Sequence, residues 1–485
     1  MKKTILILLI LLLIPTAFSD KFTDIINAKE LTTEIELSST THLEKKGPMF
    51  IVEMLKTDLY NFPDKDLNQE ILKRETEPQA EKKGDKLQYR WIQPKETINY
   101  KVTSTVKTTS QYNPIKEKIP YPIQEELKRG YDIFLKPTKH IDSTDPTIKT
   151  KAEQISQGEK DLYVLVSKTA NWVNKQVNYD INTKTEKATQ KASWVIQNKQ
   201  GVCDEITSLF IALLRAQEIP ARFVSGASYT NIPQEQNGNW GPHGWAEVYY
   251  PERGWLPYDI TFGQYGWIDS GHIKLKECVD PRDKPTKFTW QGRDAGINAS
   301  ELKIKAEIKE IGEINKPVIE ITTKTAKKKT GLNSYNLVIA EIKNLKDFYI
   351  TKELTLANVN EIEIQGEKKK LAILPPNTTK TLFWRIKTKE NLNQEYNYEI
   401  PIEIYTRLDE KGKTKFQAEY NNPEYSLNDI VKIQDIIEAG GEIPKEKENE
   451  LKEISKEENQ EIKETFPEKK MGIIQRFIKW IKSIF

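Results

Sequence analysis

The sequence predicts an α+β protein, in which a central domain of helices and an antiparallel sheet is flanked by an N-terminal β-rich domain and a C-terminal β-sandwich. Short β-favouring runs broken by prolines fill residues 20–125, helical spacing of apolar residues marks the start of 126–290, and alternating runs dominate 298–420. At about 100 to 200 residues per domain, a chain of 485 residues is long enough for two to four domains.

The composition argues against several classes of protein. Lys and Arg number 74 against 71 Asp and Glu, and the net charge of +3 creates no field that would attract nucleic acid. Two cysteines cannot build a disulfide framework or a Cys-based zinc site, and the four histidines have no metal-binding spacing. We therefore expect no nucleic-acid partner, no metal site and no cofactor.

Residues 1–19 are typical of an export signal. Two lysines precede an unbroken apolar run from Ile5 to Ile14, and small residues suited to cleavage stand before Asp20. Ten apolar residues at about 1.5 Å each cover roughly half of a ~30 Å hydrocarbon core, so an uncleaved spanning anchor is the weaker alternative. We expect an exported protein that acts outside the cytoplasm.

Residues 20–125 are predicted to form the β-rich domain, with strand-like runs at 34–37, 87–92 and 98–106. The central domain is predicted over 126–290. Apolar residues three or four positions apart predict that it begins with helices, and these are Tyr163, Val166, Ala170, Val173 and Val177.

Residues 298–420 are predicted to form the sandwich, because strand-like runs recur at near-regular spacing between turn signals. The stretch 374–384 resembles the turn and strand of Ig-like adhesion modules from exported prokaryotic proteins. This region contains neither Cys nor His. We expect it to be dispensable for the chemistry.

The C-terminal end is predicted to meet a membrane surface. Residues 421–470 form a helical and charged spacer, rich in Glu and Lys, and 471–485 place apolar residues on one helical stripe with basic residues on or beside the opposite face. Such a basic amphipathic helix is typical of an interfacial anchor, and the alternative is a helix docked on the protein itself.

Cys203 is predicted to stand at the start of a helix. The apolar residues after it follow the i, i+3, i+4, i+7, i+8 pattern, and they are Ile206, Leu209, Phe210, Leu213 and Leu214. Unpaired N–H groups and the helix dipole stabilise a thiolate at this position, so we expect a lowered pKa and a nucleophile. The same N–H groups can donate to the oxygen that becomes negative during attack on a carbonyl.

His243 and Asp259 are predicted to lie on one face of a hairpin. The strand-like run 243–250 is followed by a turn and by a returning run, 255–259. With an odd number of loop residues, Trp245 lies opposite Asp259. His243 is then the diagonal neighbour of Asp259, at about 7–8 Å between Cβ atoms. An imidazole held by a carboxylate and aimed at a thiol is what nucleophilic acyl transfer needs.

These residues resemble the transglutaminase-like family of papain-like cysteine enzymes. The resemblance is carried by Gly201-Val202-Cys203-Asp204-Glu205, Leu214-Arg215, Ile219-Pro220-Ala221-Arg222, His243-Gly244-Trp245-Ala246-Glu247-Val248 and Gly254-Trp255-Leu256-Pro257-Tyr258-Asp259. It covers roughly residues 160 to 270. The resemblance implies a papain-like core with Cys203 as nucleophile, His243 as general base and acid, and Asp259 as the residue that orients His243.

Two details are left open by the resemblance. The family usually has Gly where this sequence has Glu218, so the helix must be capped without the residue that most easily adopts a left-handed conformation. The side chain beside the oxyanion cannot be identified from spacing, and Trp172 and Trp194 are candidates.

The leading hypothesis is an exported cysteine enzyme that acts on amide bonds of a protein or peptide substrate, more by hydrolysis than by cross-linking. A protein-glutamine cross-linking enzyme is one alternative, and a non-catalytic envelope binding module is another. A disulfide between Cys203 and Cys278 is a further alternative for an exported chain with two cysteines.

Overall fold

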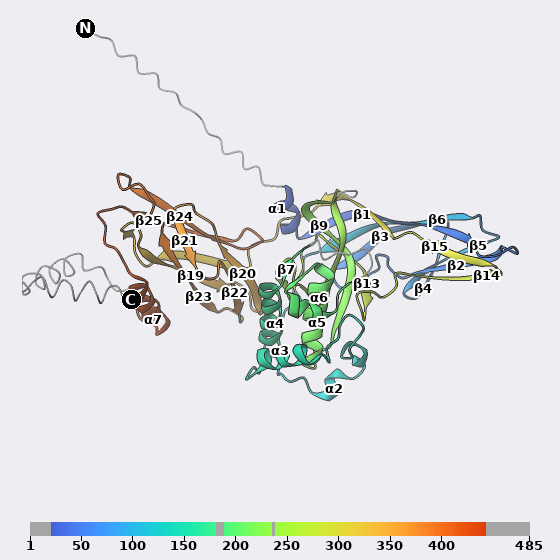
Figure 1. Ribbon diagram of the computed structural model, residues 1–485, viewed down its shortest axis with the longest axis horizontal. Coiled ribbons are helices and arrows are strands. Elements are labelled where there is room, and N and C mark those ends of the chain that lie inside the picture. The colour runs from blue at the N-terminus through green and yellow to red at the C-terminus, as the bar shows by residue number, and fades with distance from the viewer. Residues whose placement is uncertain (1–20, 181–188, 235–237, 443–485) are drawn as a thin grey trace, which may run out of the picture.

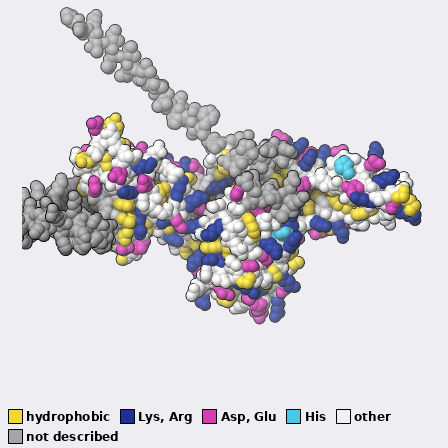
Figure 2. All heavy atoms as spheres, viewed as in Figure 1, with side chains coloured by type: hydrophobic (Ala, Val, Ile, Leu, Met, Phe, Trp, Pro, Cys, Tyr) yellow, Lys and Arg dark blue, Asp and Glu magenta, His cyan; other side chains and the backbone are white. Residues whose placement is uncertain are grey.

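The structure is a computed structural model that describes residues 21–180, 189–234 and 238–442 (Figure 1). Three parts lie in a row along its long axis: an N-terminal β unit, a central domain that holds the helices α2 to α6, and a sandwich that ends in α7. Figure 2 shows basic and acidic side chains interspersed over all three parts of one face. The central domain therefore has a neighbour on each side.

The N-terminal β unit is built from two sheets. Their strands come from the chain before the central domain and from the chain after it. Its first elements are α1 (Lys21–Asn27), β1 (Glu30–Lys45), β2 (Ile51–Leu59), β3 (Gln69–Glu77), β4 (Glu81–Lys83), β5 (Lys86–Ile92) and β6 (Thr97–Thr109). One sheet has the order β15-β1-β6-β3 with β16 also paired to β1, and the other has the order β14-β2-β5-β4. Side chains of β1 alternate between buried and partly buried, as a strand with one face on a core requires.

The strands β14 (Thr286–Arg293), β15 (Ala295–Ala299) and β16 (Lys303–Ile311) correct two sequence-based boundaries. The sequence predicts that 286–290 belong to the central domain and 298–311 to the sandwich. In the structure β14 pairs with β2, and both β15 and β16 pair with β1. The alternating pattern of residues 303–311 shows that they form a strand, but not which sheet the strand joins.

The central domain packs helices against one face of a sheet. Its elements are α2 (Glu125–Lys128), the 3-10 helix η1 (Asp132–Phe134), α3 (Pro146–Ser156), α4 (Leu162–Gln176), β7 (Asn178–Tyr179), α5 (Ala192–Asn198), β8 (Gln200–Gly201), α6 (Cys203–Ala216), β9 (Ala221–Gln234), β10 (Gly238–Tyr250), β11 (Gly254–Asp259), β12 (Gln264–Tyr265) and β13 (His272–Cys278). The strand order is β13-β9-β10-β11-β12. Helix α6 is buried along most of its length and packs on β9 and β10.

The end of α6 shows how the chain turns without the usual glycine. Glu218 adopts a left-handed conformation with φ of 59°, which is the role a glycine would take there. Its carboxylate pairs with Lys128 at 3.3 Å. The turn brings Pro220 and Ala221 back toward the sheet, so that β9 starts beside the end of α6.

The sandwich contains two sheets around a shared core. Its elements are β17 (Ile319–Thr325), β18 (Lys329–Thr330), β19 (Tyr335–Asn344), β20 (Ile350–Leu356), β21 (Ile362–Gln365), β22 (Lys369–Leu374), β23 (Thr379–Thr388), β24 (Tyr398–Tyr405), β25 (Lys411–Ala418) and α7 (Leu427–Glu438). One sheet has the order β17-β19-β23-β21. The buried Trp384 and Phe416 belong to the core between the sheets.

The other sheet of the sandwich continues the sheet of the central domain. Strand β12 pairs with β20 through Tyr265 and Thr351, which gives the order β13-β9-β10-β11-β12-β20-β24-β25-β18. Helix α7, which the sequence assigns to the spacer 421–470, packs through Ile430 and Ile433 on the outer face of β19. The sandwich therefore extends to the end of α7.

Within the described residues, no helix has the length and apolar character needed to cross a membrane. The predicted export signal, 1–19, lies outside these residues. So do most of the predicted spacer and the whole amphipathic helix, 471–485.

Candidate active site

Cys203 is the first residue of α6, as the sequence predicts. The start of this helix is capped from within, because the Glu205 carboxylate accepts hydrogen bonds of 2.9 Å from the N–H groups of Val202 and Gln190. A Cβ atom at Gly201 would come within 2.9 Å of the Cβ of Glu205, so the chain needs glycine there. The sequence Gly-Val-Cys-Asp-Glu thus supplies both the candidate nucleophile and the cap of the helix on which it stands.

The thiol of Cys203 lies beside the strand that carries His243. It accepts a hydrogen bond from the Gly244 N–H, and it donates one of 3.5 Å to Oδ1 of Asp204. Burial, and then the Asp204 carboxylate, raise the pKa of this thiol, and the Gly244 N–H opposes them. The sequence predicts a lowered pKa from the helix alone. The surroundings of the sulfur therefore oppose the lowering that the helix alone would give.

His243 and Asp259 are brought together by the hairpin of β10 and β11. Tyr250 pairs with Gly254 and Ala246 with Tyr258, which leaves a loop of three residues and continues to Trp245 opposite Asp259. The loop therefore has the odd number of residues that places His243 and Asp259 on one face of the hairpin. His243 Nε2–H donates to Asp259 Oδ2 at 2.8 Å. With Nε2–H as the donor, Nδ1 is the ring nitrogen that does not bond to Asp259.

The imidazole of His243 is enclosed as well as hydrogen-bonded. The Phe262 ring stacks on His243 at 4.7 Å between centroids and 14° between planes, and the Phe262 N–H donates to Asp259 Oδ1 at 3.0 Å. Burial alone would raise the pKa of Asp259, but His243 and a second histidine, His272, hold it well below its usual range. Asp259 is ionised and fixed at both oxygens.

Residues 149–260 match the family model described as the transglutaminase-like superfamily. The central domain of this chain is transglutaminase-like. The match includes all three residues of the candidate triad, which have the geometry described above.

Two curated relatives of this transglutaminase-like protein are themselves uncharacterised. The protein YebA of Bacillus subtilis is 27% identical over 136 residues, which are 25% of this chain and 18% of YebA. A protein of Haemophilus influenzae is 24% identical over 295 residues, which are 54% of this chain and 74% of that protein. The match to YebA thus spans under a fifth of its length.

Two solved structures are similar in part to the transglutaminase-like protein. A candidate cysteine protease from Cytophaga hutchinsonii is 16% identical, with 59% of this chain and 92% of that chain covered at a TM-score of 0.42. The periplasmic domain of TgpA from Pseudomonas aeruginosa is 17% identical, with 50% and 91% covered at a TM-score of 0.25. The family assignment rests on the model match.

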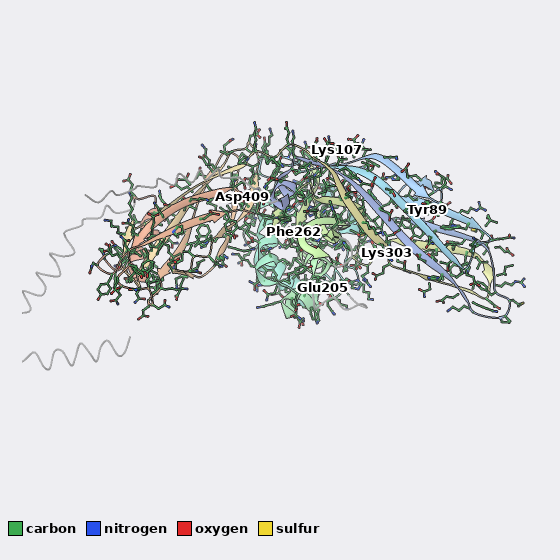
Figure 3. All side chains as sticks on the ribbon, turned by 90° about the horizontal axis from the view of Figure 1, so that it is seen from above. Tyr89, Lys107, Glu205, Phe262, Lys303 and Asp409 are labelled. Atoms are coloured by element: carbon green, nitrogen blue, oxygen red, sulfur yellow. The ribbon has the colours of Figure 1, made fainter. Side chains whose placement is uncertain are left out.

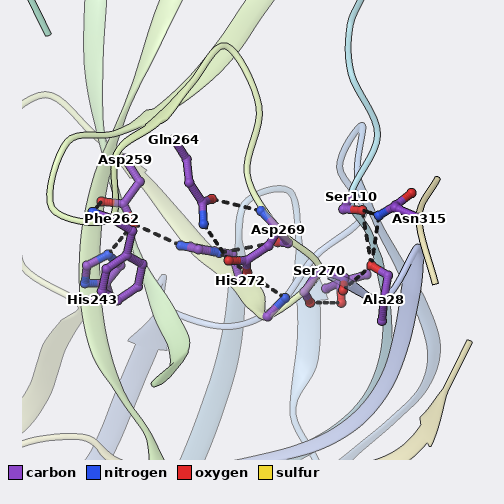
Figure 4. Close-up of polar contacts among 12 residues, drawn as sticks. Ala28, Ser110, His243, Asp259, Phe262, Gln264, Asp269, Ser270, His272 and Asn315 are labelled. Atoms are coloured by element: carbon purple, nitrogen blue, oxygen red, sulfur yellow. Dashed lines mark hydrogen bonds and ion pairs between the residues drawn. The ribbon is translucent and has the colours of Figure 1, made fainter. Parts of the chain in front are cut away.

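His272 is a site residue of the transglutaminase-like domain that the sequence analysis does not identify. Its Nε2–H donates to Asp259 Oδ2 at 3.1 Å and its Nδ1–H to Asp269 Oδ1 at 2.9 Å, with both acids buried (Figure 4). Strand β13 brings it there by pairing His272 with Ser228 of β9. A local signal exists in the spacing of Asp269 and His272, but the contact with Asp259 depends on the sheet.

A metal ion could in principle use the same cluster, since the ligating atoms of His243, Asp259 and His272 lie within 4.8 Å of one another. Both nitrogens of His272 are already engaged by carboxylates, and the Nε2 of His243 is engaged by Asp259. A ligating imidazole must offer a free lone pair. We interpret the cluster as a chain of hydrogen bonds.

Tyr179 is a second residue near the site that the sequence analysis does not identify, and its side chain is about half exposed. Burial, and then the Cys203 thiol nearby, raise the pKa of Tyr179 to about 12. With Ile206 of α6 it lines a cavity of about 540 Å³ that extends toward the sandwich, where Glu353 and Lys369 also line it. Polar and charged side chains make up much of its wall, which suits a solvated substrate segment.

The sandwich supplies one residue beside the site. The Arg407 guanidinium lies 4.4 Å from the centroid of the Phe262 ring, on the residue that stacks on His243. Figure 3 shows Phe262 in the central domain with Asp409 of the sandwich near it. The region that the sequence analysis treats as dispensable therefore contacts the wall of the active site.

The structure also locates the other residues that the sequence analysis considers. Cys203 and Cys278 are both free, so the disulfide alternative is wrong. Cys278 is buried on β13, and burial raises its pKa to about 12. Trp172 and Trp194 both pack against the core of the central domain.

Proposed function

We propose that this protein is a cysteine enzyme that cleaves amide bonds of a protein or peptide substrate through an acyl-enzyme on Cys203. The observation that carries the proposal is the pairing of His243 with Asp259 at 2.8 Å beside a thiol that receives the Gly244 N–H. A neutral thiol, an oriented imidazole and an ionised, buried carboxylate are the groups that nucleophilic acyl transfer uses.

The chemistry follows from these positions. His243 Nδ1 takes the thiol proton, and the sulfur of Cys203 attacks the substrate carbonyl carbon. N–H groups at the start of α6 face the developing oxyanion. His243 then gives its proton to the leaving amine as the carbon–nitrogen bond breaks, and a thioester remains. Water, deprotonated by His243, attacks the thioester and releases a carboxylic acid and the thiol.

Hydrolysis is the proposed outcome rather than transfer to an amine. The cavity beside Tyr179 is lined by polar groups, which include Asn174, Asn178 and Thr261. Tyr179 lies near the Cys203 thiol, so water that such a wall attracts would compete with an amine acceptor for the proposed thioester. The alternatives remain a cross-linking enzyme and a non-catalytic binding module.

A peptide library incubated with and without a free primary amine, and analysed by mass spectrometry, tests this proposal. We expect cleaved or deamidated peptides in both samples, with little amine adduct. If amine adducts predominated, the protein would be a cross-linking enzyme and the proposal of hydrolysis would be wrong. Unchanged peptides in every sample, from a protein whose thiol does not react, would favour the binding module.

We also propose that the protein acts outside the cytoplasm and is held at a membrane surface. The support is the sequence of residues 1–19 and of 471–485, where Ile and Phe form one stripe and three basic residues lie on or beside the opposite face. Fifteen helical residues reach about 22 Å at 1.5 Å each, too short for a ~30 Å core, so the proposed helix lies in the interface.

Flotation with anionic liposomes measures this attachment. We expect the mature chain to float, and to float less in high salt because basic residues attract anionic headgroups. A chain cut after Lys470, and the double variant Phe477→Glu with Ile481→Glu, should stay at the bottom of the gradient. Equal flotation of all three would mean that the segment is not the anchor.

A further inference from the structure

We propose that His272 is a positioning residue of the active site, which holds the Asp259 carboxylate in place for His243 and is itself held by Asp269. The inference rests on the proposed function of Cys203 and His243. It adds a fourth and a fifth residue to the triad, both buried, and both contributed by the segment that leads from β12 into β13.

The geometry shows a continuous chain of contacts through the site (Figure 4). Both imidazoles donate to the same oxygen of Asp259, at 2.8 Å from His243 and 3.1 Å from His272. The Phe262 N–H occupies the other oxygen. A carboxylate with three donors cannot rotate without breaking a buried hydrogen bond, so His272 limits the directions in which Asp259 can point.

Asp269 is in turn fixed by its own loop. Its carboxylate accepts the Gly271 N–H at 3.0 Å and the side-chain amide of Gln264, while the Asp269 N–H donates to Gln264 Oε1 at 2.9 Å. The next residue, Ser270, donates to the carbonyl oxygen of Ala28 at 2.8 Å. The chain of contacts from His243 therefore ends on backbone of the N-terminal β unit.

His272 carries a positive charge in this setting. Burial alone would lower its pKa, but the Asp269 carboxylate and the hydrogen bonds with Asp259 and Asp269 raise it to about 9. The charged or titratable groups around it are Asp259, Asp269 and His243, and Arg407 acts on Asp269 from the sandwich. His272 therefore brings a positive charge to the site as well as hydrogen bonds that fix Asp259.

The charge has a consequence for the reaction. The rings of His243 and His272 lie 5.7 Å apart, so a positive charge on one opposes a positive charge on the other. His243 must become positive when it takes the thiol proton and must later release that proton to the leaving amine.

The variant His272→Gln tests this inference through the pH dependence of Cys203 alkylation by iodoacetamide. The wild-type rate should rise with pH as Cys203 loses its proton. Removing a positive charge near the thiol favours its protonated form, so the midpoint of this rise should move up by about one to two pH units. The maximal rate should fall about ten- to hundred-fold because Asp259 is less well fixed.

His140 provides a matched control. It is another buried histidine of the central domain, paired with Asp280 through Nδ1 at 2.7 Å and with no part in the triad. His140→Gln should leave this midpoint in place. If a folded His272→Gln protein also had an unchanged midpoint, His272 would be a structural residue only and the inference would be wrong.

A second measurement keeps the inference testable if His272→Gln does not fold. Imidazole NMR on protein with labelled histidine should show His272 with protons on both nitrogens up to about pH 9, and Asp269→Asn should lower that titration. A neutral His272 at pH 7 would overturn the inference. If wild-type alkylation did not depend on His243, the proposed function would fail, and the NMR result would still decide the state of His272.

Discussion

Replacing Cys203 with alanine should abolish both iodoacetamide labelling at the site and any cleavage of peptide substrate, because the proposed thioester forms on its sulfur. We expect His243→Ala to lower the cleavage rate by several orders of magnitude, since the proposed reaction uses this imidazole to take the thiol proton and to protonate the leaving amine. Asp259→Asn should lower the rate less, because Asp259 orients rather than reacts. Cleavage assays and mass spectrometry of the labelled peptide measure these effects.

Cys278→Ala is the control, since it removes the other free cysteine, which is buried on β13. We expect it to keep both labelling and cleavage. Circular dichroism should show that all four variants are folded. If the Cys203→Ala protein kept full activity on the wild-type substrate, the assignment of the triad would be wrong.

Ending the chain after Lys287 should abolish labelling of Cys203, in contrast to what the sequence alone predicts. The cut removes β15 and β16, which pair with β1, and β20, which pairs with β12 next to the active site. It also removes Arg407 from the Phe262 ring. The rate of labelling and the unfolding transition of the shortened chain, measured together, test this expectation.

A chain that ends after Glu442 serves as the comparison, because it keeps α7 and every described strand. It should be labelled at the wild-type rate. Full labelling of the chain that ends at Lys287 would mean that the central domain is complete without the sandwich, as the absence of Cys and His from 298–420 suggests.

Much of the triad could be predicted because its signals are local. Cys203 follows from the helical pattern after it, and the contact of His243 with Asp259 follows from counting positions across a hairpin with a three-residue loop. Even the cap was present in the sequence, as Glu205 three residues after Val202. The pKa of the thiol was not predictable, because it depends on the burial of the sulfur and on the direction of the Asp204 side chain.

The missed features share a cause, which is distance along the chain. The role of His272 depends on the pairing of β13 with β9, and the contact of Arg407 with Phe262 depends on how the sandwich joins β12. Alternating apolar residues identify strands but not their partners. Helix α7 is different, since Ser426 and Asp429 form a capping box that the sequence displayed within the predicted spacer.

The pairing of β1 with β16 has a consequence for how the protein is made. Leu31 near the start of the chain pairs with Ile311, so one edge of β1 has no partner until that distant segment has emerged from the ribosome or from a translocation channel. An open strand edge is a template for pairing with other chains. Contacts of such high sequence separation also form slowly. A growing chain therefore exposes one unpaired edge of β1 for most of its synthesis. Chaperones that bind extended segments would protect this edge from pairing with other chains.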